Sequence, residues 1–224
     1  MKKAITILLL FALLLPLFAC EKSETSEPGD PSEQPGATGA SEKTPAASYD
    51  GEIPEDLFGI FDEESYTNAF FNVKYMRDGK WTFYTSQQLA SINGAANGET
   101  ASETLKRVGF VYDMYARSEL ETLGFTVAIP AVQYGKDMTE AEYAVATKDA
   151  SARDYAGADY DVVSDEIGTA RFGGEEHPCF YLTVAASGMT FYTAQIFLQR
   201  DGFIGVVYVS TQSEESRTAL LNSF

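Results

Sequence analysis

The chain has 224 residues and a formal net charge of −17, with 33 Asp and Glu against 16 Lys and Arg. A surface of that sign repels nucleic-acid phosphates and anionic lipid headgroups, so we expect no nucleic-acid partner and no peripheral docking on an acidic membrane. Residues 51–224 carry 26 acidic and 12 basic side chains and are long enough for one domain with a single sizeable core.

The first twenty residues have the pattern of an export signal. Two lysines at positions 2 and 3 precede an apolar run over residues 4–18, and the segment ends in Leu17-Phe18-Ala19-Cys20. This pattern resembles the lipobox of bacterial lipoproteins. The resemblance implies a signal peptide over residues 1–19, cleavage between Ala19 and Cys20, and covalent lipid on Cys20. We therefore expect the protein to be anchored by that lipid to the extracytoplasmic face of the cell membrane.

A retained transmembrane helix and an ordinary secretory signal are the alternatives for this segment. A helix needs about 20 apolar residues to cross a bilayer core, whereas this run has about 15. It is followed at once by Glu21 and Lys22. A small residue such as Ala19 also suits an ordinary signal peptidase, but Cys20 in the next position favours lipidation.

Residues 20–50 form a segment rich in Glu, Ser, Pro, Gly, Thr and Ala, with no aromatic residue before Tyr49. Such a composition buries too little apolar surface to offset the conformational entropy lost on ordering. We predict a disordered acidic tether here, with a root-mean-square reach of order 30 Å for about 30 flexible residues. A single globular domain is expected over residues 51–224.

The domain opens with a predicted hairpin and two short helices. Residues 69–76 and 81–84 have strand composition, and Arg77-Asp78-Gly79-Lys80 between them has turn chemistry. Ser86 is the expected cap of a helix that ends near residue 92. A second helix is expected over residues 102–108, with Gly109 as its stop.

Two strands and a longer helix follow in the predicted order. Residues 110–115 and 125–132 are rich in aromatic and β-branched side chains and are expected to pair as neighbours. Thr139 followed by Glu142 is a capping box, which predicts a helix to about Tyr155.

The C-terminal third predicts an antiparallel meander. Four strand-like segments are divided by pairs that contain glycine, and tight hairpins need the positive φ that glycine adopts readily. The segments are residues 161–172, 178–186, 189–199 and 203–210, and the pairs are Gly173-Gly174, Ser187-Gly188 and Asp201-Gly202. Thr211 with Glu214 resembles another capping box and predicts a last helix.

Apolar side chains occupy both alternations in residues 180–184 and 203–209, which indicates a sheet covered on both faces. The predicted fold class is therefore α+β, with an antiparallel sheet of about six or seven strands and helices on both faces.

Tyr66, Asn68 and Phe70-Phe71, followed by a hairpin, Trp81 and a capped helix, resemble the start of PsbP-like domains. The resemblance covers about residues 60–224. It implies an α/β/α sandwich around an antiparallel sheet, of the kind found in extrinsic subunits of photosystem II and in bacterial lipoproteins of unassigned function. No metal-binding or photosystem-docking residue of the family has a counterpart here. Trp81 is expected to be a core anchor.

Catalytic and metal-binding patterns are weak in this sequence. Cys20 is assigned to the lipid, which leaves Cys179 as the one cysteine of the domain and no intrachain disulfide. His177 and Cys179 share one strand face, with Ser187 as another nucleophile and Asp165 or Glu166 to orient the ring. This arrangement lacks the surroundings of known nucleophiles.

Acidic clusters at residues 62–64, 159–166 and 175–177 lack the ligand spacing of calcium or zinc sites. We expect no enzyme activity, no cofactor, no catalytic residue and no metal site.

The sequence therefore indicates a membrane-anchored extracytoplasmic lipoprotein that serves as a non-catalytic binding or accessory module. An envelope protein or polymer is the expected partner, with the aromatic side chains of Tyr112, Tyr115, Tyr134 and Tyr143 as a hypothetical contact surface. The alternative is a solute-binding lipoprotein associated with a transporter. A two-lobed receptor of that kind usually needs a longer chain.

Overall fold

The computed structural model describes residues 48–62, 64–77, 79–156 and 160–224. The predicted signal peptide, Cys20 and nearly all of the predicted tether lie outside these residues. None of the helices within the described residues is long and apolar enough to cross a membrane.

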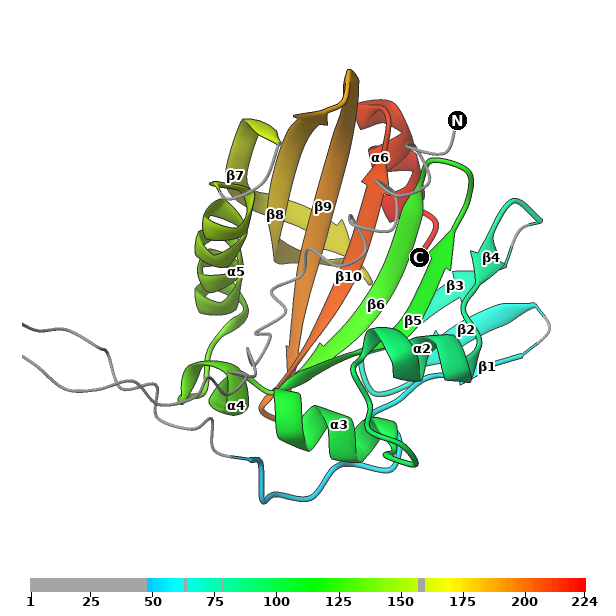
Figure 1. Cartoon of the computed structure of the whole chain (residues 1–224), viewed down its shortest axis with the longest axis vertical. Coiled ribbons are helices and arrows are strands. Elements are labelled where there is room, and N and C mark those ends of the chain that lie inside the picture. Colours follow the sequence, from blue (N-terminus) through cyan, green and yellow to red (C-terminus); the bar gives the residue numbers. More distant parts are fainter. Residues whose placement is uncertain (1–47, 63, 78, 157–159) are drawn as a thin grey trace, which may run out of the picture.

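A seven-stranded antiparallel sheet forms the centre of the domain, with strand order β4-β5-β6-β10-β9-β8-β7 (Figure 1). The strands are β4 (Thr82–Phe83), β5 (Phe110–Arg117), β6 (Thr122–Ala128), β7 (Asp161–Phe172), β8 (Glu175–Ala186), β9 (Met189–Arg200) and β10 (Phe203–Thr211). The helices are α2 (Ser86–Ile92), α3 (Ala101–Val108), α4 (Pro130–Tyr134), α5 (Glu140–Ala156) and α6 (Glu214–Leu221). The predicted α+β class and the antiparallel sheet are confirmed.

Strands β7 to β10 form the predicted meander, and each turn uses positive φ. Gly173 and Gly174 have φ of 59° and 93°, and the Ser187-Gly188 and Asp201-Gly202 pairs also lie at positive φ. Two consecutive residues of positive φ give the turn a twist that matches the right-handed twist of the paired strands. The conformation of these three turns is therefore specified by the residues of the turns themselves.

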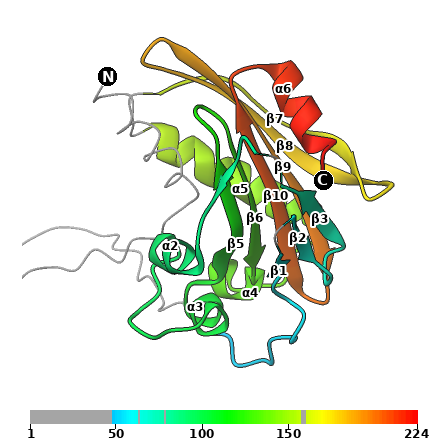
Figure 2. The same ribbon diagram turned by 90° about the vertical axis from the view of Figure 1, so that its right-hand side faces the viewer.

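Helices lie on both faces of the sheet, as Figure 2 shows for α5 and α6. Tyr143, Ala144 and Tyr155 of α5 pack with Phe180 and other side chains of one sheet face. Leu220 of α6 belongs to the core of the opposite face.

That opposite face is also covered by a small sheet that the sequence analysis did not predict. Its strands are β1 (Ile60–Phe61), β2 (Ser65–Asn68) and β3 (Val73–Met76), in the order β1-β2-β3. Tyr66 and Tyr75 from this sheet, and Phe71 from the turn between β2 and β3, lie in the same core as Trp81. Trp81 is 6 % exposed and is a core anchor as expected.

The predicted hairpin of residues 69–76 and 81–84 is wrong. β3 pairs with β2, from Ser65 opposite Met76 to Asn68 opposite Val73. β4 pairs with the end of β5 instead, where Thr82 lies opposite Arg117. Gly79 and Lys80 do form a turn, but the strands on its two sides belong to different sheets because each strand has a better partner elsewhere in the chain.

Two predicted caps are displaced, and one strand is shorter than expected. Thr85, not Ser86, caps α2, in a capping box with Gln88. Ser213, not Thr211, caps α6, since Thr211 is still part of β10. The predicted strand over 125–132 ends at Ala128 because Pro130 opens the short helix α4.

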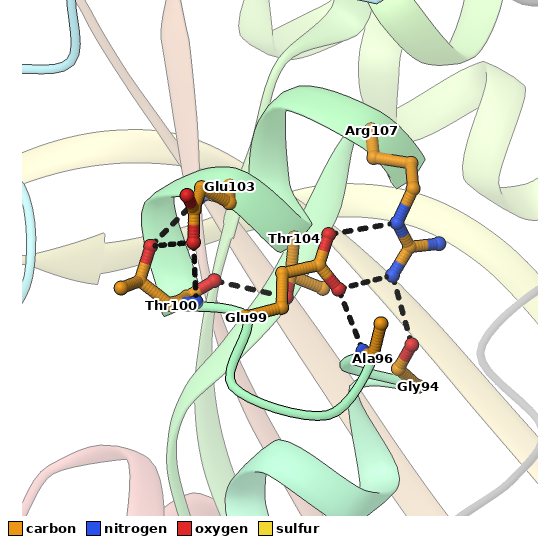
Figure 3. A network of polar contacts seen from close by, with 7 residues as sticks. All are labelled: Gly94, Ala96, Glu99, Thr100, Glu103, Thr104 and Arg107. Atoms are coloured by element: carbon orange, nitrogen blue, oxygen red, sulfur yellow. Dashed lines mark hydrogen bonds and ion pairs between the residues drawn. The ribbon is translucent and has the colours of Figure 1, made fainter.

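The helix predicted over residues 102–108 is confirmed as α3 and begins in a dense polar network (Figure 3). Thr100 and Glu103 form a capping box, and Gly109 ends the helix at φ 82°. Glu99 accepts two hydrogen bonds from Arg107, at 2.8 and 2.7 Å, and one from the Ala96 N–H at 2.7 Å. Arg107 also donates to the carbonyl of Gly94, so the loop before α3 is tied to the helix.

The capping box of Thr139 and Glu142 is formed as predicted. It starts α5, which runs to Ala156. Glu140 is the first residue of this helix.

Candidate binding site

The central sheet opens at one end, between β8 and β9. Their pairing runs from Ala186 opposite Met189 to Cys179 opposite Ile196 and stops there. Each strand continues with its other neighbour, β8 with β7 as far as Glu175 and β9 with β10 as far as Arg200. Pro178 is the next residue of β8 and has no N–H to donate to β9, which explains why the ladder ends at this point.

A cavity of about 230 Å³ lies where the two strands part. Aromatic side chains and charged or polar groups share its lining. The lining residues are Phe70, Phe71, Asn72, Glu140, Phe172, Gly173, Glu175, His177, Leu198, Gln199 and Arg200.

Glu140 bridges the gap between the two strands. One carboxylate oxygen, Oε1, accepts a hydrogen bond from the backbone N–H of Gln199 at 2.7 Å, a group that β8 would otherwise have engaged. Both carboxylate oxygens lie 3.2 Å from Nδ1 of His177. A carboxylate only accepts, so Nδ1 donates to it, and when the ring is uncharged Nε2 is an acceptor.

Three phenylalanines of the lining form an aromatic wall. Phe70 and Phe71 follow β2, and Phe172 ends β7. Arg200 packs against this wall. Its guanidinium lies 5.0 Å from the centre of the Phe70 ring and donates a hydrogen bond to the Phe70 carbonyl. Its Nε is also 3.8 Å from the carboxylate of Asp201.

The nucleophile arrangement considered from the sequence is not formed among the described residues. His177 contacts Glu140, not Asp165 or Glu166. Cys179 is completely buried in the core, and burial raises the pKa of its thiol to about 11. Ser187 is in the turn after β8, ten residues from His177 along an extended strand.

Among the residues that the structure describes, the cavity lining contains no Ser, Thr or Cys side chain. A base such as Nε2 of His177 therefore has no hydroxyl or thiol to activate within it. The lining places hydrogen-bond acceptors, such as Nε2 of the uncharged His177 ring, beside aromatic rings. This arrangement is suited to binding.

The acidic clusters do not converge as metal ligands within the part of the chain that the structure describes. Asp62 accepts hydrogen bonds from the backbone N–H groups of Glu64 and Ser65, which hold its pKa below the ordinary value. Asp165 forms an ion pair with Lys148 at 3.4 Å. Glu63 and Asp159 lie outside the described residues.

The tyrosines proposed as a contact surface are mostly internal. Tyr112, Tyr115 and Tyr143 are at most 6 % exposed. Tyr143 donates to the Gln133 side chain at 2.6 Å and packs edge to face on Tyr134, which is half-buried. These residues build the core beside α2 and α5, so they do not provide the exposed aromatic surface.

A second cavity, of about 370 Å³, lies between α6 and the β7–β8 hairpin. Its buried cation, Arg217, is paired with Glu214 at 2.7 Å and stacks 4.8 Å from the centre of the Tyr181 ring. Glu214 offsets the charge of Arg217, but Nε of Arg217 is buried without a hydrogen-bond partner among the described residues, so this cavity is a second candidate site.

No protein-family model matches this chain, and no curated protein matches it. Among solved structures, the solution structure of the cyanobacterial PsbP protein from Synechocystis is similar at 11% sequence identity and a TM-score of 0.43. That match covers 77% of this chain and 94% of the other. A protein of unknown function from Pseudomonas aeruginosa is similar at 14% identity and a TM-score of 0.26, over 48% of this chain and 74% of the other.

Sequence reasoning named His177 but missed Glu140 and Arg200. The local signal that pointed to the opening was Pro178 inside a strand, because proline in a central strand interrupts pairing on one side. Glu140, which occupies the gap between the two strands, lies 37 residues before His177 in the chain, and no local pattern identifies it.

Proposed function

We propose that this protein is a lipid-anchored module on the extracytoplasmic face of the cell membrane that binds a partner in the cell envelope without catalysing a reaction. The cavity between β8 and β9 is its binding site. The observation that carries the proposal is Glu140, which holds His177 and the backbone of Gln199 in place, while the described lining has no Ser, Thr or Cys side chain. A preorganised site of this kind lowers the entropy lost on binding.

The anchor rests on the sequence alone. Leu17-Phe18-Ala19-Cys20 after a short apolar run supports lipidation of Cys20, and the acidic tether supports a domain held at some distance from the membrane. Fractionation of cells tests this part. The unaltered protein is expected in the membrane fraction and the Cys20→Ala variant outside it, whereas a membrane-bound Cys20→Ala variant would place the anchor elsewhere.

Photo-crosslinking on intact cells tests the binding site. A photoreactive amino acid replaces Gln199, which lines the cavity and has an exposed side chain. The control position is Glu119, an exposed residue in the β5–β6 turn at the other end of the sheet. We expect a recurrent envelope adduct at position 199 that is absent at position 119.

Two results would contradict the proposal. Equal labelling at positions 199 and 119 would mean that the cavity end is not a binding surface. Turnover of a captured molecule by the purified protein would mean that the module is catalytic. A transporter subunit as the recurrent adduct would instead favour the alternative of a solute-binding lipoprotein.

A further inference from the structure

We propose that the cavity between β8 and β9 receives a lysine-type side chain of a partner protein, that is, an aliphatic chain ending in a primary ammonium group. This inference rests on the proposed binding function and specifies the chemistry of the same site. It is carried by the cavity size, by the hydrogen-bond acceptors in the lining, by the balance of charge and by the aromatic wall.

The size of the cavity fits one side chain. Pockets that enclose a whole drug-sized ligand usually measure about 300–1,000 Å³, and this cavity measures about 230 Å³. It is still far larger than the roughly 30 Å³ that a water molecule occupies in the liquid. A group that projects from a larger partner matches this volume.

Two groups of the lining are available as acceptors, Nε2 of the uncharged His177 ring and the carboxylate of Glu175. The Nδ1–H of His177 is engaged with Glu140, so Nε2 is the ring atom left to accept from a ligand. Glu175 adds a carboxylate at the rim, on an exposed position of β8. An ammonium group has three donors and no acceptor, so it is complementary to this set.

The charges favour a cation over an anion. Glu140 and Glu175 are the acidic side chains of the lining, and Arg200 is the basic one. Arg200 is already engaged by the Phe70 carbonyl, the Phe70 ring and the carboxylate of Asp201. Glu140 is likewise engaged by His177 and the Gln199 N–H, whereas Glu175 has no hydrogen-bond or ion-pair partner among the described residues. The lining therefore keeps one uncompensated carboxylate, within a domain that is acidic as a whole.

The aromatic wall suits the aliphatic part of such a side chain. Phe70, Phe71 and Phe172 are each at most 8 % exposed and form a rigid apolar surface. A lysine stem can lie on apolar surface while its charged end reaches polar groups. Ring faces also attract a nearby ammonium group.

Saturation-transfer NMR on the full-length protein in detergent measures the affinity directly. The probe is Nα-acetyl-lysine methylamide, and the matched probe without charge is its Nε-acetylated form. We expect saturable binding of the first probe and about tenfold weaker binding of the second, because acetylation removes charge-assisted hydrogen bonds. The glutamate analogue, Nα-acetyl-glutamate methylamide, is expected not to bind.

Two neighbouring substitutions locate the site. Glu175→Gln removes a carboxylate that lines the cavity, and Glu176→Gln removes one from the next residue of β8, which is exposed and does not line it. Both carry the same change of charge and should leave the fold intact. We expect lysine-probe affinity to fall about fivefold or more in Glu175→Gln and to stay unchanged in Glu176→Gln.

The outcomes separate this inference from the proposed function. An equal loss of lysine-probe affinity in both variants would mean that only the overall charge of the protein matters. Binding of the glutamate analogue would mean that the cavity binds an anion through Arg200. Either result overturns the inference. If a protein adduct forms at position 199 while the lysine probe fails to bind, the binding function stands and the ammonium chemistry is wrong. Tighter binding of cadaverine than of the lysine probe would assign the site to free diamines and overturn the partner named here.

Discussion

Tyr66 donates a hydrogen bond from its hydroxyl to Oδ2 of Asp113, a buried carboxylate 47 residues later in the chain. The same oxygen accepts from the Gly59 N–H at 2.7 Å and from Nδ2 of Asn68 at 3.0 Å. Asp113 is placed there by a bulge in β5, where the register with β6 shifts between Tyr112 and Met114. One carboxylate thus joins the small sheet to the large one.

Tyr66→Phe should lower the free energy of unfolding by about 1–3 kcal/mol, since it removes one donor from a buried acceptor without changing the ring packing. Thr67→Val, an exposed change on the same strand, is the control and should stay within about 0.5 kcal/mol of the unaltered protein. Chemical denaturation monitored by circular dichroism measures both. Equal stability of Tyr66→Phe and the unaltered protein would show that the contact does not stabilise the fold.

Asp113→Asn should flatten the dependence of stability on pH. Burial raises the pKa of Asp113 above its ordinary value of 3.8. The folded state therefore holds this proton to higher pH than the unfolded state, and stability falls as pH rises from about 3.8 to the raised pKa.

All three donors converge on Oδ2, so the oxygen of an asparagine amide can keep them and no charge is left to bury. We expect Asp113→Asn to be at least as stable as the unaltered protein at neutral pH. Asp113→Ala leaves three buried donors without an acceptor and should lower the free energy of unfolding by more than about 3 kcal/mol. Loss of similar size in both variants, measured by denaturation across pH, would contradict this account.

Cys179 should be inert in the folded protein. A thiol with a pKa of about 11 is almost entirely protonated at pH 8, and this one has no exposed surface. In the Cys20→Ala chain, where it is the remaining cysteine, we expect no reaction with Ellman's reagent until guanidinium chloride unfolds the protein. Rapid reaction without denaturant would contradict the buried position.

Gly205→Ala should destabilise the core by about 1–3 kcal/mol through overpacking. A methyl group there would lie 2.7 Å from Cζ of Phe125 and 3.0 Å from the ring of Phe71. Gly79→Ala is the matched control, because nothing lies within 4 Å of its added methyl group. Thermal unfolding distinguishes them, and equal melting temperatures would be inconsistent with this packing.

Arg107→Lys should shift acid unfolding to higher pH. Arg107 and the Ala96 N–H lower the pKa of Glu99 to about 2, so their contribution to stability is present above about pH 4.5 and is lost as pH falls toward 2. Lysine cannot reproduce the two parallel hydrogen bonds of the guanidinium (Figure 3). Arg153→Lys on exposed α5 surface is the control, and an identical acid midpoint in both variants would contradict the prediction.

Local chemistry accounts for the elements that the sequence predicted correctly. Thr139 and Glu142 satisfy the first N–H groups of α5 within four residues, and Gly109 ends α3 by its own backbone freedom. The turns at Gly173-Gly174 and Asp201-Gly202 bring consecutive strands together without reference to the rest of the chain. Such contacts depend on neighbours in sequence, so a single sequence reveals them.

The pairing predicted for β3 and β4 was wrong because it depends on contacts beyond the local sequence. β3 pairs with β2, and β4 pairs with the end of β5, although β3 and β4 follow each other in the chain. The small sheet that results covers one face of the large sheet together with α6. A turn motif marks a change of direction, but burial of Tyr66, Phe71 and Tyr75 against the large sheet decides which strands pair.

The sequence by itself determined the meander, the capped helices and the expectation of a lipid at Cys20, since each depends on residues adjacent in the chain. Only the tertiary structure decided the cavity. Pro178 ends the pairing of β8 with β9, and Glu140, brought from the start of α5, takes the freed N–H of Gln199 and orients His177. His177 lies 37 residues and Gln199 lies 59 residues after Glu140 in the chain, and packing of α5 on the sheet brings them together.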